Sequence, residues 1–175
     1  MHSSKPSPNE FAPYFGRYIS LVAEPEFASV LAGQPAEFRE LLDKLSPEQA
    51  GFRYAPGKWS IREVLGHVID AERVFGYRAL CIARGETVSL PSFDENNYAA
   101  HAGHDGCPLP ELLEEFVHVR RGHLALFGHF TQAAWERAGT VNQNAISARG
   151  LAYIMTGHAR HHAEILRERY AASGL

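Results

Sequence analysis

Apolar side chains recur at the 3.6-residue spacing of an α-helix in four separate stretches of this chain, and this periodicity restricts the fold more than any other feature. A helix with an apolar stripe is stable when that stripe is buried against other helices. A chain of 175 residues with 45% hydrophobic content can build one such core and needs no second one. We therefore expect a single all-α domain over residues 21–175, preceded by a Pro- and Ser-rich segment, residues 1–20, that is flexible.

The chain shows where the helices begin and end. Ser60 and Glu63 form a capping box at the start of the second helix, Gly85 lies just past its end, and Pro35 is expected to kink the first helix. Residues 86–107 show no periodicity and are dense in turn formers, which predicts a long connection. The economical architecture is an up-down four-helix bundle with one long connection between helices two and three. The four expected helices span residues 26–45, 61–83, 108–130 and 147–171.

Two histidines interrupt the apolar stripe of the last helix. His158 and His162 lie four residues apart, so their side chains project side by side and can chelate one divalent ion. His67 is the only histidine of the second helix, and it would supply a third nitrogen if the two helices face each other. Such a site would keep coordination positions open for water or substrate. The alternative is that each is a core histidine hydrogen-bonded to a neighbour, and the spacing by itself does not decide between the two readings.

Three segments resemble a known family: "PGKWSIREVLGHVIDAERVFGYRAL", "LPSFDENNYAA" and "HARHHAEIL". Together they are similar to the DinB-like superfamily of DNA-damage-inducible four-helix metalloproteins, in the branch with the bacillithiol transferases and metal-dependent hydrolases. The resemblance spans roughly residues 25–170 and implies that His67, His158 and His162 hold one divalent metal. It also covers the lead-in to helix two at Trp59 and the loop element Phe93, Asp94 and Glu95. Many relatives use their metal to activate a low-molecular-weight thiol.

Four further side chains are candidates for catalytic roles. Asp70 or Glu63 could accept the second ring N–H of His67, as metal-bound histidines usually require, or either could be a solvated helix carboxylate. Arg78, on the same helix face, could hold an anionic substrate group or form an intrahelical salt bridge. Asp94 lies in a connection long enough to close over a pocket, although packing alone could also explain such a loop.

Other histidines are kept out of the proposed metal ligands. His161 lies at the edge of the stripe of the last helix and could orient a ligand or touch substrate, although we expect a partly exposed structural residue. His101, His104 and Cys107 have metal-like spacing, but their glycine-rich segment holds no fixed geometry and no paired motif follows. We therefore interpret that spacing as chance.

These residues predict one divalent metal ion per chain. Neutral imidazoles suit zinc or nickel, with iron and manganese as further candidates. The leading hypothesis is a metal-dependent S-transferase in which the ion activates a low-molecular-weight thiol, a cosubstrate, for attack on an electrophilic small molecule. The alternatives are a hydrolase that activates water, and a noncatalytic metal-stabilised bundle for sensing or dimerisation.

Composition and charge narrow the possible partners. The formal net charge is −3 and no Lys/Arg cluster is interleaved with aromatic residues, which argues against nucleic acid. No apolar run is long enough to cross a bilayer and no signal peptide is apparent, so we expect a cytoplasmic protein that acts on a small molecule. Cys81 and Cys107 are expected to be reduced thiols. The second helix is apolar around most of its circumference, which indicates either a homodimer contact or the central helix of a monomeric bundle.

Overall fold

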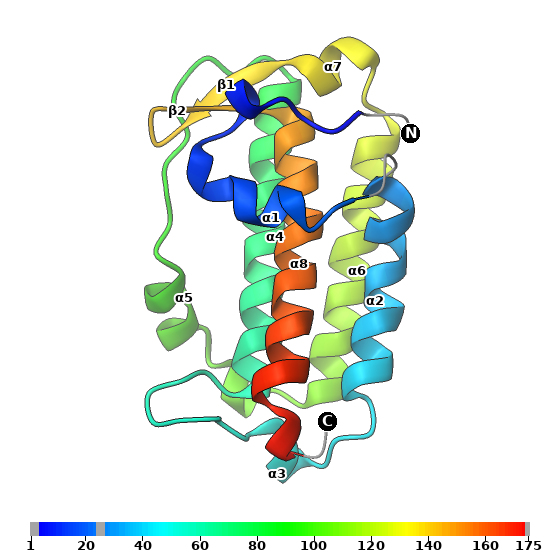
Figure 1. Ribbon diagram of the computed structural model, residues 1–175, viewed down its shortest axis with the longest axis vertical. Helices are drawn as coiled ribbons and strands as arrows, with labels where there is room; N and C mark the ends of the chain where they lie inside the picture. Colours follow the sequence, from blue (N-terminus) through cyan, green and yellow to red (C-terminus); the bar gives the residue numbers. More distant parts are fainter. Residues whose placement is uncertain (1–3, 24–26, 174–175) are drawn as a thin grey trace.

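The computed structural model describes residues 4–23 and 27–173, and it shows four long helices packed side by side (Figure 1). This confirms the predicted all-α four-helix bundle. The second helix has the predicted bounds and begins at the Ser60–Glu63 capping box, with both of its hydrogen bonds present. The other three long helices begin and end within a few residues of the expected positions. The four helices are α2 (Phe27–Leu42), α4 (Ile61–Ala83), α6 (Leu109–Gly128) and α8 (Ala148–Arg169).

The predicted long connection between the second and third helices determines their relative direction. It carries the chain back along the bundle, so that α4 and α6 point the same way while α2 and α8 point the opposite way (Figure 1). Contrary to the expectation of an irregular segment, it contains a helix, α5 (Glu95–Ala102). The Asp94 carboxylate caps α5 by accepting the backbone N–H groups of Asn96 and Asn97. Only Ala99 of this helix is buried, so α5 has no apolar stripe that a periodicity search would detect.

A two-stranded antiparallel hairpin that the periodicity did not predict precedes α8. Its strands are β1 (Ala138–Val141) and β2 (Asn144–Ser147), too short to show a clear alternation. Asn142 and Gln143 form the turn with φ values of 47° and 61°. Leu90 joins the hairpin to the long connection, because its N–H donates to the Thr140 carbonyl at 2.9 Å and its carbonyl accepts from the Asn142 N–H at 2.8 Å.

The remaining elements are single turns of helix around the ends and one side of the bundle. They are α1 (Gly16–Ser20), α3 (Pro47–Ala50), α7 (Gln132–Glu136), and the 3-10 turns η1 (Pro8–Glu10), η2 (Pro13–Phe15), η3 (His104–Gly106) and η4 (Ala171–Ser173).

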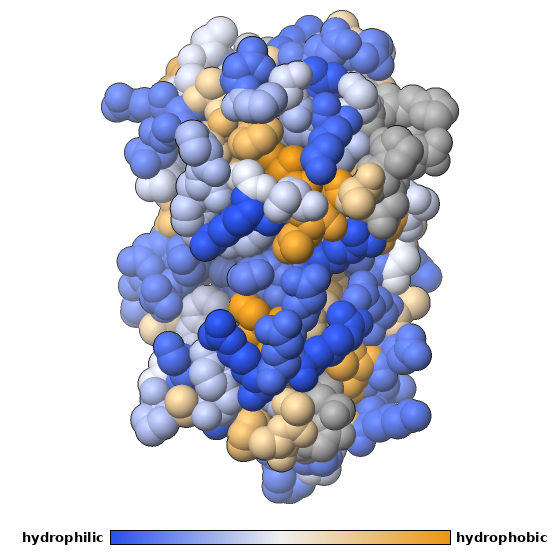
Figure 2. Space-filling view, viewed as in Figure 1, coloured by the Kyte–Doolittle hydropathy of each residue, from blue (hydrophilic) through white to orange (hydrophobic). Residues whose placement is uncertain are grey.

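The N-terminal segment, predicted to be flexible over residues 1–20, is packed on the bundle in its described part, residues 4–20. Tyr18 is buried, and α1 lies directly against α8 at Gly157, where a Cβ would stand 2.0 Å from the Tyr18 carbonyl oxygen. The Glu10 carboxylate accepts a hydrogen bond of 2.6 Å from Arg149 Nε. Figure 2 shows hydrophobic side chains gathered where these N-terminal elements cross an otherwise mostly hydrophilic face. The domain therefore begins before residue 21, while residues 1–3 lie outside the described part.

A buried arginine joins all four long helices. The Arg120 side chain on α6 is fully buried and donates to both carboxylate oxygens of Glu72 on α4, at 3.0 and 2.7 Å. On α2 it donates to the Leu31 carbonyl at 2.6 Å and to Gln34 Oε1 at 2.5 Å. The Gln34 amide in turn donates to the Thr156 carbonyl of α8 at 2.7 Å. No spacing rule pointed to this network.

The apolar character of α4 on most sides is explained within one chain. Apolar residues of α4 pack against α6 and α8, and two hydrophobic clusters of the core share them. A partner subunit is not needed to bury them, and the homodimer stays a prediction. In the described ranges, no helix combines the length and apolarity that a membrane crossing requires.

We expect Arg120→Met to lower the free energy of unfolding by about 3–5 kcal/mol, because it removes the arginine partner of the buried Glu72 carboxylate and leaves that carboxylate only the contact with His123 Nδ1 at 3.2 Å. The double variant Arg120→Met/Glu72→Leu should recover most of that loss, since no unpaired charge remains. Urea denaturation at neutral pH measures both. Arg39→Met removes the exposed pair with Glu114 across the same two helices, α2 and α6, and should cost less than about 1 kcal/mol. Equal losses for the two single variants would contradict the role given to the buried pair.

Candidate metal centre

Three histidines from two neighbouring helices converge at the middle of the bundle. His67 lies on α4, and His158 and His162 lie one turn apart on α8. The Nε2 atom of His158 is 3.1 Å from that of His67 and 3.2 Å from that of His162. One ring nitrogen from each residue lies within 4.8 Å of the others. All three side chains are buried, with exposed fractions of 7%, 5% and 8% for His67, His158 and His162.

The donor set fits a divalent cation. Two nitrogens bound tetrahedrally at about 2.05 Å from zinc are about 3.3 Å apart, close to both measured Nε2 separations. A neutral imidazole carries one N–H, so three Nε2 atoms facing one another cannot all find complementary partners among themselves. The Nδ1 atom of His162 is also buried without a hydrogen-bond partner in the described part of the chain. A cation between the rings would give all three lone pairs one common partner.

The electrostatics keep these rings neutral at pH 7. Burial lowers the pKa of His67 from its ordinary value of 6.5 to about 4. Burial, reinforced by the neighbouring histidines, holds the pKa values of His158 and His162 well below the ordinary value. A neutral imidazole has a free lone pair, which is the form that binds a metal ion.

Aromatic residues hold the rings in place. The Trp59 ring packs on His67 with a centroid separation of 4.7 Å. Tyr18 from α1 and Phe75 from α4 contact the His158 ring edge-on, at 5.3 and 5.6 Å. The N-terminal segment therefore contributes directly to the site, because α1 carries Tyr18 over α8.

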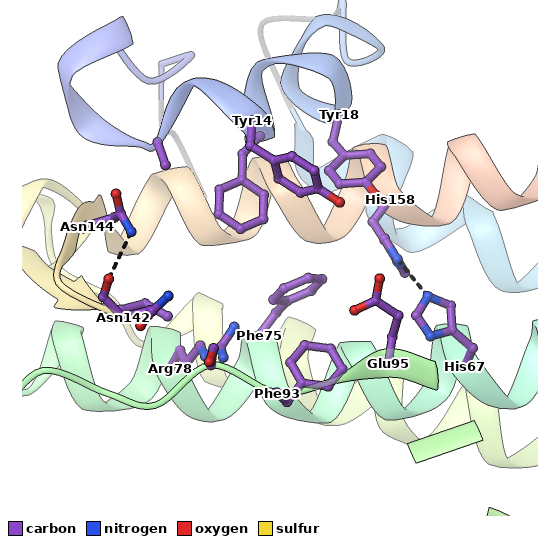
Figure 3. Close-up of a pocket in the computed structure, with 14 residues that line it drawn as sticks. Tyr14, Tyr18, His67, Phe75, Arg78, Phe93, Glu95, Asn142, Asn144 and His158 are labelled. Atoms are coloured by element: carbon purple, nitrogen blue, oxygen red, sulfur yellow. Dashed lines mark hydrogen bonds between the residues drawn. The ribbon is translucent and has the colours of Figure 1, made fainter. Parts of the chain in front are cut away.

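A cavity of about 340 Å³ opens beside His67 and His158 (Figure 3). Arg78, Asn142 and Asn144 lie at its far end, and Glu95 from the start of α5 points its carboxylate toward the two histidines. Its apolar wall is mainly aromatic and includes Tyr14, Phe15, Tyr18, Phe75 and Phe93.

The sequence analysis placed Glu95 in a loop element and gave it no chemical role. Its position follows from the Asp94 cap, which starts α5 so that the next side chain turns into the cavity. A carboxylate directly after an aspartate, a residue type that commonly caps helices, was the signal that could have found it.

A second, smaller cavity of about 230 Å³ lies against His162. Two cationic side chains, Lys58 and Arg169, line it together with the aromatic rings of Tyr54 and Tyr170. The three-histidine cluster is thus bordered by one cavity at His67 and His158 and by another at His162.

The carboxylates proposed beside His67 have other partners. Glu63 accepts the Ser60 N–H in the capping box and pairs with Arg53, and Asp70 lies 3.6 Å from Arg73. Among the described residues, no hydrogen bond joins either carboxylate to His67. Asp94, the third candidate carboxylate, caps α5.

Arg78 is the catalytic candidate that the structure places in the cavity wall. Its side chain is 5% exposed and donates from Nη2 to the Pro91 carbonyl at 2.7 Å. Within the described ranges it forms no intrahelical salt bridge, which was the alternative reading of this residue.

Among the residues that the structure describes, the other histidines lie outside the cluster. His161 packs edge-on against Tyr18 at 5.5 Å and is partly exposed. His101 bonds to the Asn97 carbonyl at 2.8 Å, and His104 packs against α4 where Gly66 leaves room for its ring. In the part of the chain that the structure describes, His67, His158 and His162 form the one group of three potential metal ligands that lie close enough to hold an ion.

Comparisons with known proteins agree with this fold. A model of the DinB superfamily matches residues 31–166. The "Putative metal-dependent hydrolase GK0616" of Geobacillus kaustophilus is 27% identical over 145 residues, covering 78% of each chain.

Two solved structures are similar in fold. YfiT from Bacillus subtilis, described as "a probable metal-dependent hydrolase with an unusual four-helix bundle topology", superposes with a TM-score of 0.77 at 16% identity, over 98% of this chain and 95% of its own. A mycothiol-dependent maleylpyruvate isomerase gives a TM-score of 0.64 at 13% identity, over 79% of this chain and 58% of its own.

In the metal-free protein, stability is expected to fall as the pH drops from about 6.5 to about 4. Histidines of the unfolded chain take up protons below 6.5, whereas His67 stays neutral until about pH 4, so protonation favours the unfolded state. For His67 alone the loss at pH 4.5 is about 2–3 kcal/mol. Urea denaturation of chelator-treated protein between pH 7.5 and 4.5 should show a shallower slope for His67→Gln. His118→Gln, on the exposed face of α6, should leave the slope unchanged.

Proposed function

The chain belongs to the DinB superfamily, and from that premise we propose that it is a metal-dependent enzyme that activates a small nucleophile at His67, His158 and His162. The main support is that three neutral, buried imidazoles converge, and that two of them, His67 and His158, line a cavity large enough for a small molecule. Three protein ligands leave room for a further, exchangeable one, which is the pattern of catalytic rather than structural sites. Zinc or nickel suits three imidazoles, with iron or manganese as further candidates.

The ion, when bound, lowers the pKa of a thiol or a water molecule and so supplies a nucleophile at neutral pH. The residues of the chain provide the surroundings. Trp59, Tyr18 and Phe75 hold the imidazoles in position, and the aromatic wall keeps the reacting groups away from bulk water. The Glu95 carboxylate points toward the histidines and can accept the proton that the nucleophile loses (Figure 3).

The first candidate reaction is S-transfer from a low-molecular-weight thiol to an electrophilic small molecule. A transferase needs room for two substrates, and cavities border the histidine cluster at His158 and at His162. The cavity at His162 carries Lys58 and Arg169, which suit a thiol cosubstrate with carboxylate groups. The fold shared with a mycothiol-dependent isomerase supports this assignment.

The second candidate reaction is hydrolysis. Glu95 is placed to act as a general base toward water as well as toward a thiol. Two of the similar proteins are described as metal-dependent hydrolases, which supports this alternative. The two reactions share the same metal ligands and differ in the nucleophile.

Metal binding is tested first. Elemental analysis of the purified protein should give one divalent metal per chain, and His158→Ala should lose it. His104→Ala, a buried histidine on the other side of α4, is the matched control and should retain the metal. Chelation should lower the melting temperature without unfolding the chain, because the core is large enough to stand without the ion. Loss of metal in His104→Ala with full retention in His158→Ala would refute the assignment, and so would a random-coil spectrum of the metal-free protein.

Activity is tested with cysteine, glutathione, coenzyme A and bacillithiol, each with a chromogenic electrophile, and in parallel with ester and amide substrates. Metal-loaded protein should accelerate thiol conjugation, and His67→Ala should abolish the effect while keeping the helical spectrum. Glu95→Gln should lower kcat by about 10²–10⁴ with the metal content unchanged, whereas Glu111→Gln on the surface of α6 should have no effect. Hydrolysis without conjugation would favour the second candidate. The absence of activity in all assays would favour a noncatalytic bundle.

A further inference from the structure

The end of the cavity away from the histidines carries a buried cation. Arg78 is the only Lys or Arg among the described residues that line the cavity, and its side chain is 5% exposed. Figure 3 places its guanidinium group at the opposite end from Glu95 and His158. A buried charge is costly unless it is paired, so a buried arginine beside an empty volume calls for a partner.

Most hydrogen-bonding capacity of Arg78 is free for a ligand. One Nη2 N–H donates to the Pro91 carbonyl, and the guanidinium carbon lies 5.5 Å from the centre of the Phe93 ring. A guanidinium has five N–H donors, and within the described ranges no carboxylate pairs with Arg78. The other buried arginine, Arg120, has the two oxygens of Glu72. Burial also lowers the pKa of Arg78, as expected for a cation without a bound anion.

The hairpin adds neutral polar groups at the same end. Asn142 lies in the turn with a positive φ of 47°, and its carbonyl accepts from the Asn144 side chain at 2.9 Å. The Asn142 carboxamide makes no hydrogen bond within the part of the chain that the structure describes. The link between Leu90 and the hairpin backbone holds this wall in place. This end therefore offers hydrogen bonds and one positive charge, without a carboxylate to repel an anion.

The two ends of the cavity are far enough apart for a ligand longer than an ion. His67 and Arg78 are eleven residues apart on α4, which corresponds to a rise of about 16 Å along the helix. Phe75 and Phe93 lie between them in the cavity wall (Figure 3). A ligand that reaches both ends must be polar or anionic at one end and apolar in its middle.

We propose that this cavity binds an elongated organic carboxylate, with its carboxylate on Arg78 and its apolar body between Phe75 and Phe93. The opposite end of the molecule then reaches His67 and His158. This inference rests on the proposed function only where it places the reacting group of the ligand at the histidines. Binding of the carboxylate to Arg78 requires no metal. Arg78 is thus the residue that selects the substrate and sets its direction in the site.

The test compares 4-phenylbutyrate with its neutral amide, 4-phenylbutyramide, by isothermal titration calorimetry. The protein is used metal-free at pH 8, where the histidines are neutral and cannot attract the anion. The carboxylate should bind the wild-type chain about tenfold or more tightly than the amide, as expected for a charge-assisted, bidentate contact. Arg78→Gln should remove this preference, and Arg73→Gln, an exposed arginine on the same helix, should retain it.

Equal affinity for the two compounds, no binding of either at millimolar concentration, or a preference that survives in Arg78→Gln would each overturn the inference. If Arg78→Gln does not fold, the Nε–Hε resonance of Arg78 in the wild-type protein gives the answer, since it must shift with the carboxylate and not with the amide. His158→Ala should keep the preference. If the protein prefers the carboxylate to the amide but shows no metal-dependent activity, the proposed function alone is refuted. If it shows metal-dependent activity but no preference for the carboxylate, the anion subsite alone is refuted.

Discussion

The buried pair between Arg120 and Glu72 sets the position of the four helices relative to one another. Arg120 reaches α4 and α2 directly, and Gln34 extends the network to the Thr156 carbonyl of α8. Glu72 lies five residues after His67, and Thr156 lies two before His158. A slide of either helix along its axis would leave a buried charge unpaired, at a cost of several kcal/mol. The contact that aligns the histidine cluster is therefore a set of polar bonds elsewhere in the core.

The regular and irregular parts of the chain contribute different things to the site. The two long helices α4 and α8 supply the histidines, whose spacing depends on helix geometry alone. The N-terminal segment, the long connection and the hairpin supply most of the cavity wall, including Tyr18, Phe93 and Asn142. Changes in these segments would alter what the cavity accepts and leave the three histidines in place, which is how one bundle can serve several substrates.

Charge is distributed unequally along the cavity. Neutral imidazoles and the Glu95 carboxylate stand at one end, and the Arg78 guanidinium stands at the other (Figure 3). An anionic group is repelled by Glu95 and attracted by Arg78, so a long ligand has one favoured direction. Arg78 is only 5% exposed, so water screens its attraction little, whereas Glu95 is exposed and its repulsion is weaker.

What the sequence determined by itself was local. The Ser60–Glu63 capping box defined the start of α4, and the spacing of His158 and His162 defined a chelating pair, because both depend on residues within one turn of helix. The assignment of His67 to the same cluster depended on α4 facing α8, which only the folded bundle decides. The tertiary structure alone gave the pair of Arg120 with Glu72, the cavity position of Glu95 and the packing of residues 4–20 on α8. For Arg78 the sequence left a salt bridge and an anion site open, and the fold placed it in the cavity wall. These features join residues distant along the chain, and helical periodicity records which face of a helix is buried but not what lies against it.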